Sequence, residues 1–137
     1  MARRGVHHLE IVVSSLERSL PLYRELLEPL GYTELYEVVG ERGEPVWDLA
    51  GEGVGASLSL RQAQTEVTAP YDRYAVGLHH LAFEAESREV VDERLAWARA
   101  QGLEIENDPQ EWPYSPGYYA GFFHDPDGMK LEVVHVP

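Results

Sequence analysis

The sequence predicts an α+β protein in which one βαβββ unit occurs twice. Two segments, VHHLEIVV at 6–13 and LHHLAFEA at 78–85, share a histidine pair followed by strand-like alternation. Their second histidines, His8 and His80, lie 72 positions apart, and the helix-ending glycines Gly31 and Gly102 lie 71 apart. Shifting the last predicted strand back by 73 places Glu132 on Ser59. Such nearly constant offsets indicate a duplicated unit.

Composition restricts the class of protein. The chain has 137 residues, of which 44% are hydrophobic, and this predicts a single compact domain at 1–137. A formal net charge of −13 argues against nucleic-acid binding, which needs a basic surface. The absence of cysteine excludes disulfides and thiolate metal sites. No apolar run approaches the ~20 residues of a membrane span, and the N-terminal segment has no signal-peptide pattern, so we expect a cytoplasmic protein.

The first module is expected at 5–61. In its first strand, at 6–13, His8 and Glu10 share one face. Ser14 and Glu17 have capping-box spacing and predict the start of a helix that ends at Gly31. Pro21 opposes this helix, so either the helix begins near Ser19 or it tolerates a distortion in an early turn. Three further strands are expected at 33–39, 45–49 and 56–61.

The second module is expected at 77–137, after a linker at 62–76 that has no clear period. Its strand at 78–85 is followed by a helix at 87–101 that ends at Gly102. A proline-rich loop is expected at 108–117. The remaining strands are expected at 103–107, 118–124 and 130–135.

Three side chains form the candidate site. His8 and His80 occupy equivalent places in the two modules, and alternation in the last strand puts Glu132 on the face that does not pack against the helix. Two imidazoles and one carboxylate can bind a divalent metal ion and leave positions free for substrate and water. The preceding histidines, His7 and His79, are expected to point the opposite way and to pack beneath the helices. A one-residue slip of the strands would exchange these roles, so the choice rests on the resemblance described next.

The two histidine segments, the segment DPDGMKLEVV at 125–134 and the paired βαβββ order resemble the vicinal oxygen chelate superfamily. This superfamily includes glyoxalase I, extradiol ring-cleaving dioxygenases, fosfomycin-modifying enzymes and metal-free bleomycin-binding proteins. The resemblance covers essentially the whole chain. It implies a curved, cup-like mixed sheet with helices outside and metal ligands at His8, His80 and Glu132. The position of the family's optional fourth ligand falls on Ser59, which is not a usual ligand and so counts against a four-ligand site of the glyoxalase I type; Asp48 is the acidic residue nearby that could supply one.

Several other residues are candidates for the same site. Glu10, Tyr118 and His124 have side chains that move protons or donate hydrogen bonds to substrate oxygens. The alternative for each is an ordinary strand residue. Candidates for contact with the substrate are Tyr119, Trp112, Tyr114 and Ser59.

The resemblance implies an enzyme that binds one divalent ion (Fe, Mn, Zn, Ni or Co) and chelates vicinal oxygens of a small substrate, stabilising an enolate-like or oxyanion intermediate. A glyoxalase-like lyase and a ring-cleaving dioxygenase both fit. One alternative is a metal-free drug-binding protein of the bleomycin-resistance type, and another is the same fold without a working site. The expected partner besides the substrate is a second copy of the chain, in a homodimer.

Overall fold

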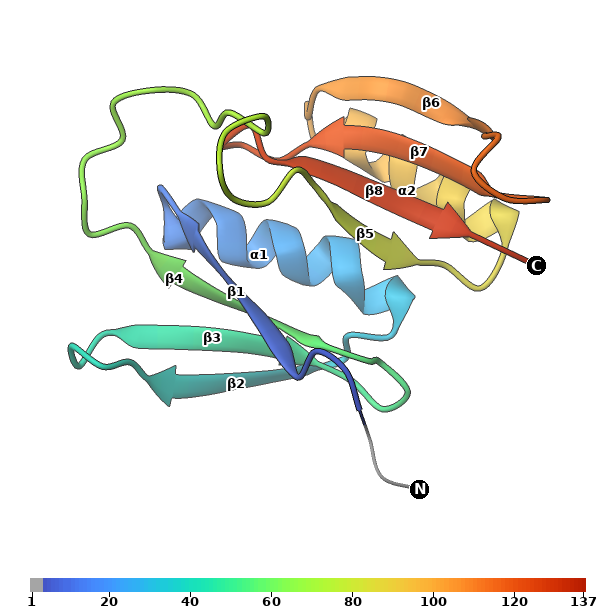
Figure 1. Ribbon diagram of the computed structural model, residues 1–137. Coiled ribbons are helices and arrows are strands. Elements are labelled where there is room, and N and C mark those ends of the chain that lie inside the picture. Colours follow the sequence, from blue (N-terminus) through green and yellow to red (C-terminus); the bar gives the residue numbers. More distant parts are fainter. Residues whose placement is uncertain (1–3) are drawn as a thin grey trace. The chain divides into compact units, whose positions relative to one another are not determined.

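The computed structural model describes residues 4–137, and the chain divides into two compact units, one ending at Thr68 and the other beginning at Ala69. Each unit has a four-stranded mixed sheet and one long helix, as Figure 1 shows. The predicted α+β fold with a doubled βαβββ order is confirmed. Over residues 4–137, no helix has the length and apolar character that crossing a membrane requires.

Unit 1 contains a sheet with the strand order β1-β4-β3-β2. β1 runs parallel to β4, and the other neighbouring strands are antiparallel. The elements of unit 1 are β1 (His8–Val13), α1 (Leu16–Leu27), a short 3-10 helix η1 (Glu28–Leu30), β2 (Glu34–Val39), β3 (Pro45–Ala50) and β4 (Ser57–Gln62).

Helix α1 begins one residue later than the capping-box spacing predicts. Ser15, not Ser14, is the N-cap, and its hydroxyl accepts a hydrogen bond from the backbone N–H of Arg18. Pro21 lies inside the helix on its exposed side, so of the two alternatives the helix tolerates the proline. Gly31 ends the helical segment with φ 103°, a left-handed conformation that favours glycine.

Unit 2 repeats this arrangement with the strand order β5-β8-β7-β6. Strand β5 is shorter than predicted, so that His79 and His80 precede it. Strand β6 extends through Pro109, where a loop was expected; its register is irregular between Ile105 and Gln110, and an edge strand tolerates proline. The elements are β5 (Leu81–Glu84), α2 (Arg88–Ala100), β6 (Ile105–Glu111), β7 (Tyr119–His124) and β8 (Lys130–His135).

Strand register supports the alignment of the two modules. In unit 1, Glu10 of β1 pairs with Ser59 of β4. In unit 2, Ala82 of β5 pairs with Glu132 of β8. Both pairs join the first and last strands of their unit, and their members are related by the offsets of 72 and 73 found in the sequence. Ser59 and Glu132 are therefore equivalent positions.

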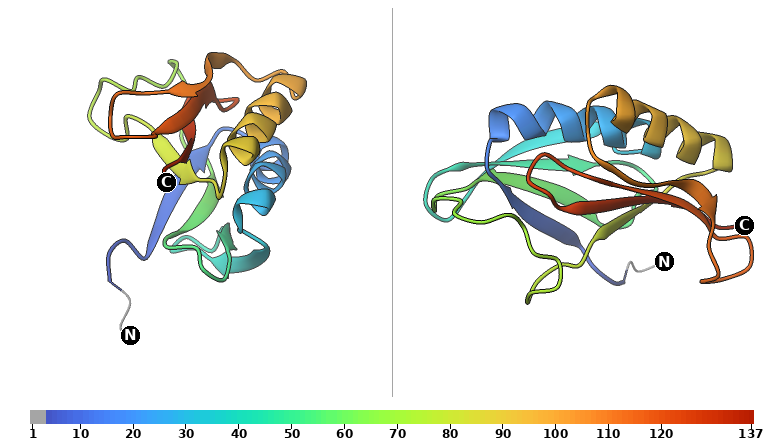
Figure 2. Two further views of the ribbon diagram at one scale, coloured as in Figure 1. Left: turned by 90° about the vertical axis from the view of Figure 1, so that its right-hand side faces the viewer. Right: turned by 90° about the horizontal axis from the view of Figure 1, so that it is seen from above.

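The helix of each unit lies against one face of its own sheet (Figure 2), but the two contacts differ. Helix α2 contacts β6, β7 and β8, whereas the main sheet contact of α1 is with β4. A Cβ atom added to Gly121 of β7 would lie 2.5 Å from Cγ of Leu95 in α2, so the glycine permits close packing. The equivalent position in unit 1, judged by strand register, is Trp47.

The expected linker at 62–76 is partly anchored. Gln62 ends β4, and the backbone N–H of Ala63 donates to the carbonyl of Val13 in unit 1. Further along, Arg73 forms an ion pair with Glu106 of β6, with 2.6 Å between Nη1 and Oε1. The second half of this segment therefore belongs structurally to unit 2.

Candidate functional site

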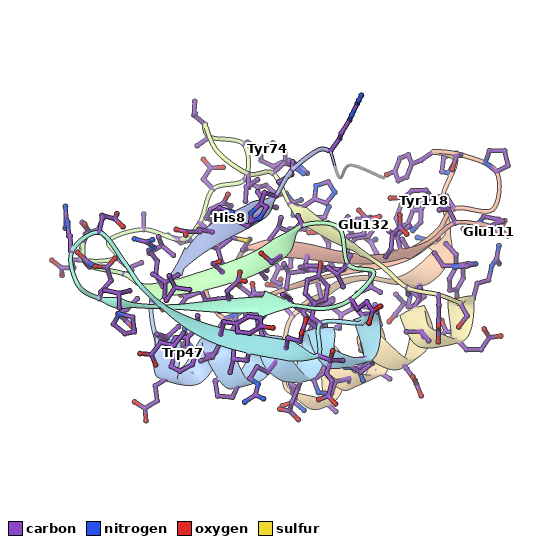
Figure 3. All side chains as sticks on the ribbon, turned by 90° about the horizontal axis from the view of Figure 1, so that it is seen from below. His8, Trp47, Tyr74, Glu111, Tyr118 and Glu132 are labelled. Atoms are coloured by element: carbon purple, nitrogen blue, oxygen red, sulfur yellow. The ribbon has the colours of Figure 1, made fainter. Side chains whose placement is uncertain are left out.

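Glu132 is the most deeply buried carboxylate of the candidate site. It lies on β8 between Ala82 of β5 and Phe122 of β7, and only 2% of it is exposed. The Nε2 atom of His80 lies 3.0 Å from its Oε1 atom, and the hydroxyl of Tyr118 donates a hydrogen bond to Oε2. Figure 3 labels Tyr118 and Glu132 on this face of the sheet. Both carboxylate oxygens are thus hydrogen-bonded, as a buried carboxylate requires.

Tyr118 is held in its protonated form. Burial and, after it, the hydrogen bond to Glu132 raise the pKa of this phenol above its usual value. A phenol with a raised pKa remains a donor at neutral pH. In this structure Tyr118 therefore donates its hydroxyl proton in a hydrogen bond to Glu132.

Aromatic side chains adjoin Glu132 on the same face. Trp112 and Tyr118 pack on a buried cluster formed by Ala120, Phe122 and Val134. The indole N–H of Trp112 donates to the carbonyl of Ala120 at 2.8 Å. The rings of Trp112 and Tyr114 are parallel, with 5.9 Å between their centroids, and Tyr114 is 64% exposed. Together they form an apolar wall with a fixed orientation.

Each histidine next to a predicted ligand contacts that ligand directly. The Nδ1 atoms of His79 and His80 lie 2.8 Å apart, and those of His7 and His8 lie 2.9 Å apart. Partial desolvation, with the nearby charges of His80, Lys130 and Arg73, lowers the pKa of His79. His7 and His79 are exposed, so the prediction that they pack beneath the helices is wrong. Both precede their strands, where strand alternation does not apply.

The corresponding face of unit 1 contains a pocket of about 350 Å³ with a mixed polar and apolar lining. His8, Glu10, Asp48, Ser59 and Arg61 are among the residues that line it. Ser59 is 4% exposed and donates a hydrogen bond of 2.7 Å to Asp48.

Arg61 is the centre of the charged groups in unit 1. Its guanidinium lies 2.7 Å from Glu10, 2.9 Å from Glu41 and 3.0 Å from Glu44. Glu10, a candidate base, is therefore paired with a cation in this structure.

A second charged cluster in unit 2 surrounds Glu106 of β6. His124 lies 2.9 Å and Arg73 2.6 Å from its Oε1 atom, and Lys130 lies 2.8 Å from Oε2. Burial acts to raise the pKa of Glu106, but these three hydrogen bonds outweigh it and lower the pKa to about 2. The sequence did not single out Glu106, because nothing in its local pattern distinguishes it from other acidic strand residues.

The predicted site residues do not form one cluster, and His124 lies with Glu106 as described above. His80, Glu132, Tyr118, Trp112 and Tyr114 belong to connected contacts in unit 2. The hydroxyl of Tyr119 instead donates to Asp92 of α2, on the helix side of the sheet. His8, Glu10 and Ser59 belong to unit 1. Within residues 4–137, no group of three or more histidine, aspartate or glutamate side chains is gathered to hold a metal ion.

Comparisons with known proteins identify relatives along nearly the whole chain. The family model of the Glyoxalase/Bleomycin resistance protein/Dioxygenase superfamily matches residues 5–133. The uncharacterised protein YqjT of Bacillus subtilis (strain 168) is 34% identical over 133 residues, which cover 94% of this chain and 97% of YqjT.

Two crystal structures are also similar. A candidate glyoxalase from Bacillus halodurans has 33% identity and a TM-score of 0.75, and the match covers 96% of this chain and 95% of that protein. A glyoxylase/bleomycin resistance protein/dioxygenase domain from Frankia sp. EAN1pec has 27% identity and a TM-score of 0.78, with 99% and 94% coverage.

Proposed function

The chain belongs to the glyoxalase/bleomycin resistance protein/dioxygenase superfamily, and from this premise we propose that it is a divalent-metal-dependent enzyme acting on a small molecule. The observation that carries the proposal is the approach of an imidazole nitrogen, Nε2 of His80, to the buried carboxylate of Glu132. The proposed reaction is of the glyoxalase or ring-cleaving dioxygenase type, on a substrate with two adjacent oxygen atoms.

The donor set fits a divalent ion. Imidazole nitrogen and carboxylate oxygen suit Fe, Mn, Zn, Ni and Co, and a buried carboxylate is stabilised by a cation. His80 and Glu132 are two of the proposed ligands. His8 is the proposed third ligand. It stands two positions before Glu10, and His80 stands two positions before Ala82. Because Glu10 and Ala82 are equivalent in the two units, His8 and His80 are equivalent as well. When bound, such an ion supplies Lewis-acid chemistry to substrate oxygens.

The surrounding residues support the binding of substrate and the orientation of the carboxylate. Tyr118 fixes one oxygen of Glu132 by hydrogen bonding. Trp112 and Tyr114 supply an apolar surface. The indole N–H of Trp112 already donates to a backbone carbonyl, so this surface favours contact with a flat, apolar part of the substrate. In unit 1, the hydroxyl of Ser59 and the carboxylate of Asp48 supply polar groups to the pocket.

The alternative is a metal-free protein that binds a drug-like molecule. The pocket in unit 1 and the stacked Trp112–Tyr114 pair favour it, because both are features of a binding surface and neither needs a metal. The buried Glu132 counts against it, since a pure binding protein gains nothing from a buried carboxylate facing an imidazole.

Metal analysis of protein purified without an affinity metal separates these functions. We expect about one divalent ion per chain, removable by chelator with a loss of thermal stability. His80→Ala should abolish uptake in a folded chain. His135→Ala, which removes an imidazole bonded to the carbonyl of Ala85, should not. A chain that takes up no metal and is unaffected by chelator would contradict the metalloenzyme and favour the binding protein.

A screen of catechols, 2-oxoaldehyde–thiol adducts and epoxide antibiotics then selects the reaction class. Turnover of a catechol that requires iron and consumes dioxygen identifies the dioxygenase. Turnover of an oxoaldehyde adduct without dioxygen identifies the lyase.

We also propose a cytoplasmic homodimer. Its structural support is the exposed apolar surface of β2, an edge strand on which Tyr36, Val38 and Val39 are all more than half exposed. Light scattering after size exclusion should give twice the mass of the chain, and a monomer mass at micromolar concentration would contradict the dimer.

A further inference from the structure

The same contact between neighbouring imidazole rings occurs in both histidine pairs, and neither the fold nor the proposed metal ligands account for it. In each pair the Nδ1 atoms face each other, at 2.8 Å for His79 and His80 and at 2.9 Å for His7 and His8. Two imidazole nitrogens at this distance share one proton, because one must donate while the other accepts. The ring nitrogen of His80 that faces Glu132 is then Nε2.

We propose that His79 and His7 are positioning residues, each accepting the Nδ1–H of the next histidine so that Nε2 of His80 and of His8 is left as the ligand atom. This inference rests on the proposed function. Metal-binding histidines commonly donate their second N–H to a partner that fixes the tautomer and the ring orientation. Here the partner is the adjacent histidine, which accounts for the doubled histidine in both modules.

Neighbouring rings hold the second pair in place. The ring of Tyr74 lies edge-on to that of His79, with 5.4 Å between centroids. The ring of Phe122 is similarly placed against His80, at 6.3 Å. A tautomer is fixed only if the rings cannot turn, and these contacts restrict both side-chain rotations.

With a neutral imidazole at His80, the metal-free protein has the opposite tautomers in unit 2. Glu132 accepts from the hydroxyl of Tyr118 at Oε2 and from Nε2 of His80 at Oε1, so this Nε2 carries a proton. Nδ1 of His80 then accepts from Nδ1–H of His79. When Nε2 becomes a ligand, its proton leaves to water and the shared proton moves to Nδ1 of His80. Water then returns a proton to Nε2 of the exposed His79, so the number of bound protons is unchanged.

The first pair lacks this constraint. Nε2 of His8 lies 3.9 Å from the nearest oxygen of Glu10, too far for a hydrogen bond. His8 therefore does not need to change its tautomer when it binds a metal ion.

Nitrogen-15 NMR of histidine-labelled protein, without metal and with Zn²⁺ alone, tests the tautomers. The metal-free protein should have the proton of His79 on Nδ1 and that of His80 on Nε2. Zn²⁺ should invert both. A proton on Nε2 of His79 in the metal-free protein would overturn the proposal, and so would a tautomer of His79 that Zn²⁺ leaves unchanged.

Zn²⁺ affinity by chelator competition tests the consequence for binding. His79→Leu removes the acceptor and should weaken affinity by about 10- to 100-fold. His79→Asn keeps an acceptor oxygen near the place of Nδ1 and should stay within a few-fold of wild type. His135→Gln is the control for loss of an unrelated imidazole.

The outcomes separate the two proposals. Equal affinity in wild type, His79→Leu and His79→Asn would overturn the positioning role while leaving the proposed metal site intact. A wild-type chain that takes up no Zn²⁺ would overturn the proposed metal site and, with it, the role of both positioning histidines.

Discussion

The open faces of the two sheets differ in chemistry although their strands follow the same order. In unit 1, β1 carries the acid, Glu10, and β4 carries Ser59. In unit 2, β5 carries Ala82 and β8 carries the acid, Glu132. Glu10 is balanced by Arg61, whereas Glu132 is buried against the imidazole of His80 and the phenol of Tyr118. The difference shows that duplication preserved the frame of the unit while the charge on each face was redistributed.

Glu132→Gln should have the largest effect on this comparison. It keeps the shape but removes the charge, so metal uptake should fall by more than the ~100-fold expected for loss of an outer partner. Ser59→Ala, at the equivalent position of unit 1, should leave uptake within a few-fold. Both are measured by metal titration with chelator competition, and equal effects would mean that the two faces contribute alike.

Gly121→Ala should destabilise unit 2 because the new methyl group meets Leu95. Overpacking of this kind lowers the free energy of unfolding by about 1–3 kcal/mol. Gly55→Ala in unit 1 is the matched control, because its added Cβ atom meets nothing within 4 Å. Urea unfolding of both variants tests whether α2 depends on close approach to its sheet, and no loss for Gly121→Ala would refute it.

Acid should weaken unit 2 through Glu106. Its pKa of about 2 lies below the ordinary 4.5, so its stabilising contribution is complete above pH 4.5 and is lost as pH falls toward 2. Allowing for partial exposure, we expect a loss of about 1–2 kcal/mol. Urea unfolding at pH 7, 4 and 3 measures it. Glu106→Gln should reduce the change in unfolding free energy over this acidic range. Glu34→Gln, on the exposed side of β2, should leave that change as it is in the wild type.

The helix N-caps should show the smallest effects, and equal ones. Ser15 and Ser87 both accept a hydrogen bond of 3.2 Å from a backbone N–H three residues later. Replacing either with alanine should lower the free energy of unfolding by about 1 kcal/mol. Thermal unfolding of the two single variants compares these losses. Equal losses would show that the two units match in energy as well as in geometry, and clearly different losses would show that they do not.

The sequence predicted the frame because the frame depends on local patterns. Strand alternation, the glycine at 31 and the spacing of the histidine segments each report on a few adjacent residues, and together they specified βαβββ twice. Where long-range contacts decide, prediction failed. The extension of β6 past Pro109 depends on its being an edge strand, and the exposure of His79 depends on where β5 begins.

The candidate site was predicted in part. His80 and Glu132 meet in unit 2, because their strands are neighbours in the predicted order. The sequence predicted that Tyr118 could donate a hydrogen bond, but it did not identify Glu132 as the acceptor. The group around Glu106 was missed because its three partners come from 73, 124 and 130, positions that no sequence pattern connects.

The anchoring of the inter-unit segment suggests where the gene could be divided. Ala63 is tied to β1, and Arg73 is tied to β6, so the peptide between them contributes little to either sheet. Two separately expressed polypeptides, broken near Thr68, would each retain a complete βαβββ element set. Such fragments would allow one half to be isotopically labelled or exchanged for that of a relative while the other is left untouched.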